Sequence, residues 1–296
     1  MKANLSWIFT ALIFLGIIPT LIFWPKAKLL FPQADYTPQL SYKLQSKIAA
    51  PQALDFSTAK KLTVKASFYL VFNLDSGQVY LASGAAEKIS PASFTKLLTG
   101  QVALDLGFSD QLLTATRTSV DKVPTILGLK VGEQFQLSDL LRAAIATSAN
   151  DAAATLAEGI ASQNGLVLSD FVDLMNKKGE LLKMENSHFS NPDGLDDTAQ
   201  FSTLTDIARL VQNTVKNYPE IMAAAISDRQ DITESSTHGF YYVSNWNGLL
   251  GVYPGVFGGK IAFTENAGNS TIVLSERNKV RLAVIVSGAP TLLDRD

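Results

Sequence analysis

Hydrophobic periodicity changes twice along this chain of 296 residues. Two runs rich in β-branched and aromatic residues flank an Asp-Ser-Gly turn and predict a hairpin. A helical period then dominates from Ser93 to about Ile226, after which strand-like runs return. The five strand-like runs are at about 66–73, 78–83, 257–263, 270–275 and 280–287. This order predicts one mixed α/β domain of the α+β type, in which the N- and C-terminal segments share an antiparallel five-stranded sheet and a helical subdomain lies between them.

The first 28 residues, MKANLSWIFTALIFLGIIPTLIFWPKAK, contain an uncharged and mostly apolar stretch. Its 20 residues, 5–24, would span about 30 Å as a helix, which is enough to cross a bilayer. The run ends in Phe-Trp-Pro-Lys and not in the small residues of a cleavage site, so we expect an uncleaved anchor. The protein would then be a single-pass protein of the cell membrane with its folded domain outside the cytoplasm.

The segments that follow differ in composition. Residues 25 to about 63 mix four prolines with polar residues and have no sustained period, which is typical of a stalk. We therefore expect a short tail at 1–4, a transmembrane signal-anchor at 5–24, a stalk at 25–63 and the folded domain at 64–296. The chain stops soon after the last strand, at GAPTLLDRD, so no C-terminal β domain is expected.

Composition excludes several kinds of chemistry. The net charge is −2 and there is no long basic run, so nucleic acid is not an expected partner. Cysteine is absent, which rules out disulfides, thiolate metal sites and cysteine nucleophiles. Only His188 and His238 could serve as imidazole bases, and a multi-histidine metal site is not expected. Any nucleophile must therefore be Ser, Thr, Lys or a carboxylate.

The sequence SPASFTKLLTG contains the first candidate pair, Ser93 and Lys96. At positions i and i+3 of a helix, the two side chains lie on one face, and a lysine with a depressed pKa can take the proton of a serine hydroxyl. STAK, at Ser57 to Lys60, has the same spacing. Such a pair is more often a helix cap beside a solvated lysine, so the spacing alone does not identify a site.

Two further groups stand out by position. Ser148 and Asn150, in IATSANDAA, lie where two helices meet and need polar partners if buried; the same Ser-x-Asn spacing recurs at Ser162 and is typical of helix capping. Lys260, in GGKIAFTENAG, begins an apolar strand, where a cation could hold a carboxylate. Lysines on edge strands also serve simply to prevent aggregation.

Together, the Ser-x-x-Lys, Ser-x-Asn and strand-borne lysine motifs occur in an order that resembles the low-molecular-mass penicillin-binding proteins, and specifically the serine-type D-alanyl-D-alanine carboxypeptidases. LKVGEQFQLSDLLRAAIATSANDAAATLAE, HFSNPDGLDDTAQFSTLTDIARL and SNWNGLLGVYPGVFGGK resemble segments of that family. The resemblance covers about residues 64–290. It implies the β-lactamase/transpeptidase-like fold, and it leaves Ser57 and Lys60 as a chance match.

The resemblance also implies an acylation step. Ser93 would attack the carbonyl between the two terminal D-alanines of a peptidoglycan stem peptide, and Lys96 would accept its proton. The backbone N–H groups of Ser93 and Phe263 would form the oxyanion hole. β-Lactam antibiotics would be covalent inhibitors, and no metal or other cofactor is expected.

The same resemblance gives roles to the other motifs. Ser148 would relay a proton towards the leaving amine, and Asn150 would hold Lys96 and the substrate amide. Lys260 would lie near Ser148, attract the terminal carboxylate and favour the neutral form of Lys96.

The third motif departs from the family's Lys-Thr-Gly. Ile261 cannot donate the hydroxyl hydrogen bond that threonine would give the carboxylate, a loss of about 1.5–3 kcal/mol. Ala262 adds a methyl group where the strand passes the nucleophile. Thr264 is a candidate for a substitute hydroxyl.

Three other functions share some of these motifs. A non-catalytic peptidoglycan-binding homologue would explain the Lys-Ile-Ala sequence, and a DD-endopeptidase would carry every motif named above. A class A β-lactamase is disfavoured because no convincing segment carries its deacylating glutamate.

Overall fold

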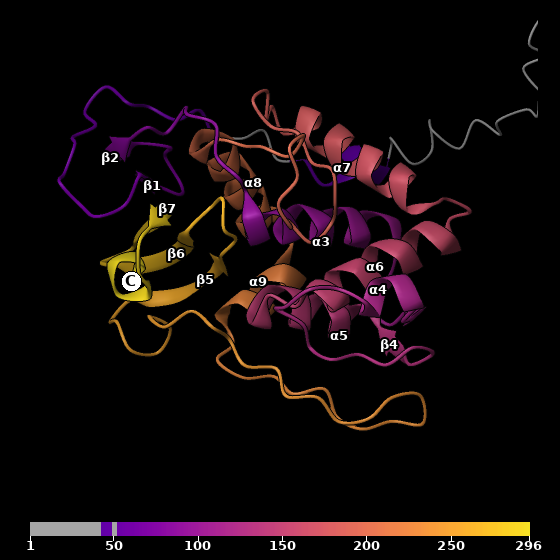
Figure 1. Cartoon of the computed structure of the whole chain (residues 1–296). Coiled ribbons are helices and arrows are strands. Elements are labelled where there is room, and N and C mark those ends of the chain that lie inside the picture. Colours follow the sequence, from indigo (N-terminus) through magenta and orange to yellow (C-terminus); the bar gives the residue numbers. More distant parts are fainter. Residues whose placement is uncertain (1–42, 49–51) are drawn as a thin grey trace, which may run out of the picture. The chain divides into compact units, whose positions relative to one another are not determined.

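The structure is a computed structural model that describes residues 43–48 and 52–296 (Figure 1). The predicted anchor at 5–24 lies outside these residues. Within them, no helix has both the length and the apolar composition that crossing a bilayer requires.

A five-stranded antiparallel sheet joins the two ends of the folded domain, as the periodicity predicts. The strands are β1 (Phe68–Asn73), β2 (Val79–Ser83), β5 (Val256–Ala262), β6 (Asn269–Arg277) and β7 (Val280–Ala289). Their order is β2-β1-β7-β6-β5, so β1 pairs directly with the last strand, with Val71 opposite Val284. Lys260 lies opposite Ile272 on the edge strand β5. The predicted hairpin and the three C-terminal strands are thereby confirmed.

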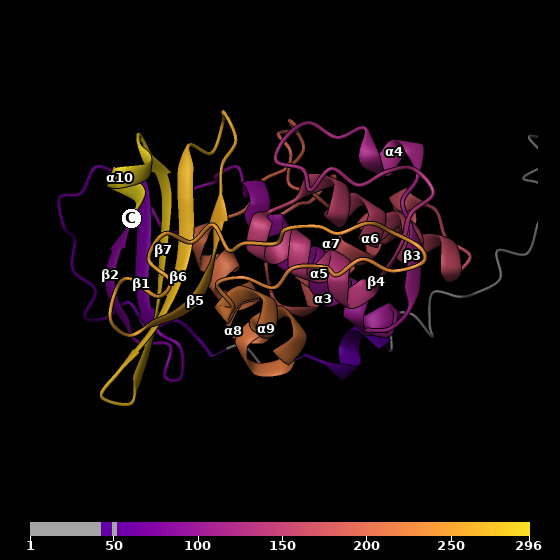
Figure 2. The ribbon, with the colours of Figure 1, turned by 90° about the horizontal axis from the view of Figure 1, so that it is seen from below.

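Most of the helices form the second layer, in which α8 and α9 contact the sheet through β1, β7 and β5, whereas α10 lies against β6 and β7 (Figure 2). The helices are α3 (Thr95–Leu106), α4 (Arg117–Val120), α5 (Leu137–Arg142), α6 (Asn150–Gln163), α7 (Leu168–Leu181), α8 (Leu204–Asn217), α9 (Pro219–Ile226) and α10 (Leu292–Arg295). Nearly every residue of α3 is buried, because this helix packs on α6, α7, α8 and α9. A helix that is buried on all sides is fixed in place by its neighbours, so the side chains on α3 have well-defined positions.

Four short elements have no counterpart in the sequence prediction. β3 (Leu112–Thr114) and β4 (Gln134–Gln136) form a separate two-stranded sheet, a 3₁₀ turn η1 (Ala92–Phe94) precedes α3, and a π-helical turn η2 (Ala143–Thr147) follows α5. Each has only three to five residues, which is too short for a hydrophobic period to be recognised.

Part of the segment expected to be a stalk packs on the domain. Asp55 and Lys60 form parallel bridges with Gln78 and Leu81, beside β2. Farther upstream, Leu44 is fully buried in the hydrophobic core. These contacts show that packing extends N-terminal to residue 64, while the boundaries of the tail and the anchor stay predictions.

Candidate active site

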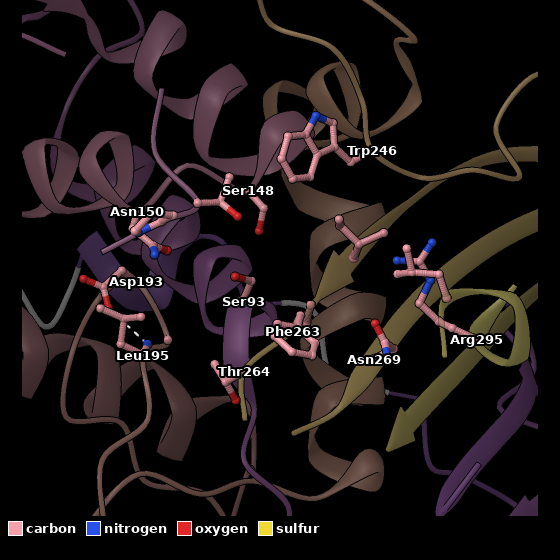
Figure 3. A pocket seen from close by; sticks show the side chains of 16 residues that line it. Ser93, Ser148, Asn150, Asp193, Leu195, Trp246, Phe263, Thr264, Asn269 and Arg295 are labelled. Atoms are coloured by element: carbon pink, nitrogen blue, oxygen red, sulfur yellow. Dashed lines mark hydrogen bonds between the residues drawn. The ribbon is translucent and has the colours of Figure 1, made fainter. Parts of the chain in front are cut away.

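A cleft of about 540 Å³ lies between the helical layer and the edge strand β5 (Figure 3). Ser93, Ser148 and Asn150 line it from the helical side, whereas Ile261 and Phe263 line it from the end of the sheet. The sequence motifs are therefore brought together from three distant parts of the chain.

Ser93 lies in the turn η1, immediately before α3. Ala92 has a φ of 44°, in the left-handed region that non-glycine residues seldom adopt. Gly194 packs against this turn so closely that a Cβ atom there would be 1.9 Å from the Ala92 carbonyl oxygen. The position of the nucleophile candidate thus depends on a strained turn and on the neighbouring loop.

Lys96, one helical turn later, is fully buried beneath Ser93. Its Nζ lies 2.8 Å from Ser93 Oγ and donates to Asn150 Oδ1 at 2.7 Å and to the carbonyl oxygen of Asp193. Burial lowers the pKa of Lys96 to about 8, although Asp193 and Asp151 act to raise it, and Lys122 lowers it further. About one tenth of Lys96 would be neutral at pH 7 and able to accept the serine proton.

Ser148 and Asn150 lie at the junction of two helices, as the sequence predicts. Ser148 ends the π-helical turn η2 in the left-handed conformation, with φ 65°. Asn150 begins α6, and its Nδ2 donates to the Val123 carbonyl at 2.9 Å. This bond turns the Oδ1 atom of Asn150 towards Lys96, so the amide has a fixed orientation in the site.

Lys260 points from β5 to the opposite side of the same cluster. Its Nζ donates to Ser148 Oγ at 2.6 Å and to the Ile261 carbonyl at 2.8 Å. Burial, followed by the charge of Lys96, holds the pKa of Lys260 well below its usual value. The two lysines therefore reach the two serines from opposite walls of the cleft, in the order Lys96–Ser93 and Lys260–Ser148.

Lys122 is a further cation that acts on Lys96, and its charge lowers the pKa of Lys96. The charge of Lys96 in turn lowers the pKa of Lys260, because the two buried amines belong to one cluster and like charges repel. The expected effect of Lys260 on the neutral form of Lys96 stays a prediction.

The residues after Lys260 form the cleft wall. The Ile261 side chain lines the cleft, and Ala262 is buried at the end of β5. Thr264 also lines the cleft, but its hydroxyl donates to Asp196 Oδ1 at 2.7 Å and is not free to replace that of a threonine at 261. Phe263 lies at the mouth with an exposed side chain, and the role of its N–H stays a prediction.

Four residues near the reactive groups were not predicted as parts of the site. Asp193 lies in the Asn-Pro-Asp-Gly-Leu-Asp segment, which the family resemblance had marked. Trp246 and Arg295 line the cleft, and the Arg295 guanidinium donates to both carboxylate oxygens of Asp296 at 2.7 Å. Lys122 follows α4, and no motif in the sequence could have identified it.

The serine, lysine and histidine residues that the sequence analysis did not assign to the site lie outside the cleft. Ser57 and Lys60 are exposed beside β2 and do not line the cleft. His188 and His238 stack on Phe201 and Phe135. Within residues 43–48 and 52–296, no three carboxylate or imidazole groups gather as potential metal ligands, and chemistry without a metal stays a prediction.

Known proteins resemble this chain in sequence. The D-alanyl-D-alanine carboxypeptidase DacF of Bacillus subtilis is 28% identical over 256 residues, which cover 83% of this chain and 64% of the relative. The carboxypeptidase DacC of Escherichia coli is 29% identical over 250 residues, which cover 79% of this chain and 59% of the relative. The chain thus spans less than two thirds of the length of these curated relatives.

Solved structures show the same fold. A D-alanyl-D-alanine carboxypeptidase from Mycobacterium tuberculosis superposes with a TM-score of 0.71 and 26% identity, covering 83% of this chain and 92% of that one. The DD-transpeptidase of Streptomyces K15 has a TM-score of 0.74 at 24% identity, covering 80% and 94%, and this likeness concerns the fold alone.

The sequence pattern of the family described as D-alanyl-D-alanine carboxypeptidase matches residues 55–291, which is well over half of the chain. The matched range includes Ser93, Lys96, Ser148, Asn150 and Lys260. This protein therefore belongs to the D-alanyl-D-alanine carboxypeptidase family, peptidase family S11.

Proposed function

We propose that this protein is a serine-type D-alanyl-D-alanine carboxypeptidase that removes the terminal D-alanine of peptidoglycan stem peptides. The observation that carries the proposal is the buried Lys96 amine, 2.8 Å from the Ser93 hydroxyl and with a pKa lowered to about 8. A neutral amine at that distance can act as the general base for a serine nucleophile.

In acylation, Ser93 Oγ attacks the carbonyl carbon between the two D-alanines while its proton passes to Lys96 Nζ. The carbonyl oxygen becomes an oxyanion, for which the N–H groups of Ser93 and Phe263 are the proposed donors. The C–N bond then breaks, and Ser148 passes a proton to the leaving amine of D-alanine. That proton is the one that Lys96 took from Ser93, so Lys96 is neutral again before deacylation, and Lys260, 2.6 Å from Ser148 Oγ, holds the Ser148 hydroxyl in place for the relay.

In deacylation, a water molecule attacks the ester that joins Ser93 to the shortened peptide. Its proton goes to the Lys96 amine, and the peptide carboxylate leaves as Ser93 regains its hydroxyl hydrogen. Asn150 keeps Lys96 aligned during both steps through the bond of 2.7 Å to its Oδ1. The mechanism needs no group beyond this chain, the peptide and water.

The proposed location is the cell membrane, with residues 5–24 as a single span and the folded domain outside the cytoplasm. This location places the cleft where peptidoglycan is made, and it makes β-lactam antibiotics accessible covalent inhibitors. It is supported by the apolar run of 20 residues near the N-terminus.

Fluorescent penicillin added to intact cells that express the full chain tests both the chemistry and the location. We expect a covalently labelled band in the membrane fraction, and we expect Ser93→Ala to lose it. Purified protein should also release D-alanine from a peptide that ends in D-Ala-D-Ala. A folded protein that binds such peptides without being labelled would instead be a binding protein, and cleavage restricted to cross-linked muropeptides would indicate an endopeptidase.

A further inference from the structure

An ion pair links the two loops that enclose Lys96. Lys122 Nζ lies 3.0 Å from Asp193 Oδ2, and the side chains are 22% and 1% exposed. Lys122 follows α4, whereas Asp193 lies in the loop between α7 and α8. Such a buried carboxylate needs a compensating charge, since an unpaired charge away from water is costly.

Both loops also bind the catalytic cluster directly. The Asp193 backbone carbonyl accepts from Lys96 Nζ, and Asp193 Oδ1 accepts from the Leu195 N–H at 3.1 Å. On the other side, Asn150 donates its backbone N–H to the Thr125 carbonyl at 2.7 Å. The ion pair therefore closes a ring of contacts around the Lys96 amine.

We propose that Lys122 is a positioning residue for Lys96: it holds the Asp193 carboxylate and offsets the negative charge that this carboxylate places beside the amine. The proposal rests on the function proposed above, in which Lys96 must lose its proton before Ser93 can attack. Lys122 itself touches neither Ser93 nor the substrate in this scheme.

Lys122 and Asp193 have opposite effects on the pKa of Lys96. Asp193 and Asp151 favour the protonated amine and raise its pKa, and Lys122 disfavours it and lowers the pKa. Asp151 is already engaged by the N–H groups of Leu127, Gly128 and Leu129. Lys260, which faces the cluster from β5, is bound to Ser148 Oγ and the Ile261 carbonyl, and burial and the charge of Lys96 hold its pKa well below its usual value. Lys122 is thus the cation that counters Asp193.

The test is the pH dependence of Ser93 acylation by penicillin in the full chain. The wild-type rate should rise with pH through an acid limb near the Lys96 pKa of about 8. Lys122→Met removes a positive charge, raises the pKa of Lys96 and moves the limb to higher pH, with a roughly threefold to tenfold slower rate at pH 7. Asp193→Asn removes a negative charge, lowers this pKa and moves the limb to lower pH.

Opposite shifts of the acid limb in Lys122→Met and Asp193→Asn would show an effect of charge. Structural damage to the loops would not move the limb in opposite directions in the two variants. Lys122→Arg should keep the limb at the wild-type pH, as should Lys130→Met, which removes an exposed lysine on the same segment. The inference is overturned if the acid limbs of Lys122→Met and Asp193→Asn stay at the wild-type pH or move in the same direction.

If Lys122→Met does not fold, the direction of the shift in Asp193→Asn decides alone. A wild-type protein that is never acylated would refute the proposed function, whereas an acylated one with unmoved limbs would refute this inference only.

Discussion

Ile261 follows Lys260 directly on the cleft wall, so its side chain borders the space next to Ser148. A substrate carboxylate in that space meets a hydrocarbon surface where a hydroxyl could donate a hydrogen bond. The Thr264 hydroxyl does not compensate, because it donates to Asp196. Lys260 is buried behind this wall and is bound to Ser148 Oγ and the Ile261 carbonyl, so it supplies no exposed hydroxyl-like donor in place of threonine.

Ile261→Thr should therefore raise the proposed carboxypeptidase activity. A hydrogen bond to a charged group contributes about 1.5–3 kcal/mol, which corresponds to a roughly ten- to hundredfold rise in kcat/KM. The measurement is D-alanine release from an N-acylated peptide ending in D-Ala-D-Ala. Ile261→Val is the matched control, since valine has the shape of threonine without its hydroxyl. Equal gains in both variants would show that space, and not hydrogen bonding, limits the native site.

At the scale of elements, the turn η1, which carries Ser93, and the loop that carries Asp193 and Gly194 act as one unit. Gly194 has a φ of +82°, and a Cβ atom there would lie 1.9 Å from the Ala92 carbonyl oxygen and 3.1 Å from the Ser93 nitrogen. Neither the loop nor the turn can move without displacing Ser93 or the carbonyl that binds Lys96. The close approach at Gly194 is therefore a requirement of the site as well as of the fold.

We expect Gly194→Ala to slow penicillin acylation at least about tenfold, because the new methyl group must push the turn away from Lys96. Gly132→Ala provides the control: Gly132 has a φ of +91° but no atom within 4 Å of an added Cβ. That substitution should cost about 1–2 kcal/mol of the free energy of unfolding from backbone strain and leave acylation near wild type. Acylation rates and urea unfolding distinguish the two. Equal losses of acylation in both variants would mean that backbone strain alone explains the effect.

The sequence predicts the elements with a clear period and misses those set by contacts across the chain. The strands around Val71 and Lys260 are long enough to show their pattern, and the three motifs place Ser93 and Ser148 correctly at one cleft. The left-handed Ser148 and the turn η2 leave no periodic signal, since their shape comes from packing. Motif analysis does not identify Lys122, because its partner Asp193 is distant along the chain.

Over the whole molecule, the cleft exists only when distant segments meet. Its groups come from the turn η1 and α3, from the junction between η2 and α6, and from β5. The strand β5 is held at the edge of the sheet because β6 pairs with it and with β7, and β7 pairs with β1. A second cluster ties the upstream segment to the helical layer. Lys178 Nζ donates to Asp105 Oδ2 at 2.8 Å, to Tyr218 Oη at 2.7 Å and to the Leu44 carbonyl at 2.8 Å.

This second cluster should matter for stability far more than a surface ion pair does. Both charged groups are fully buried, so Lys178→Met leaves the Asp105 carboxylate without its cation and should cost about 3–5 kcal/mol of the free energy of unfolding. Adding Asp105→Asn removes the stranded charge and should recover part of that loss. Lys177→Met breaks only an exposed pair with Glu180 and should cost about 1 kcal/mol or less. Urea unfolding followed by circular dichroism measures these three variants and Asp105→Asn alone. A double variant that loses as much as the sum of its single changes would show that the two side chains do not stabilise each other.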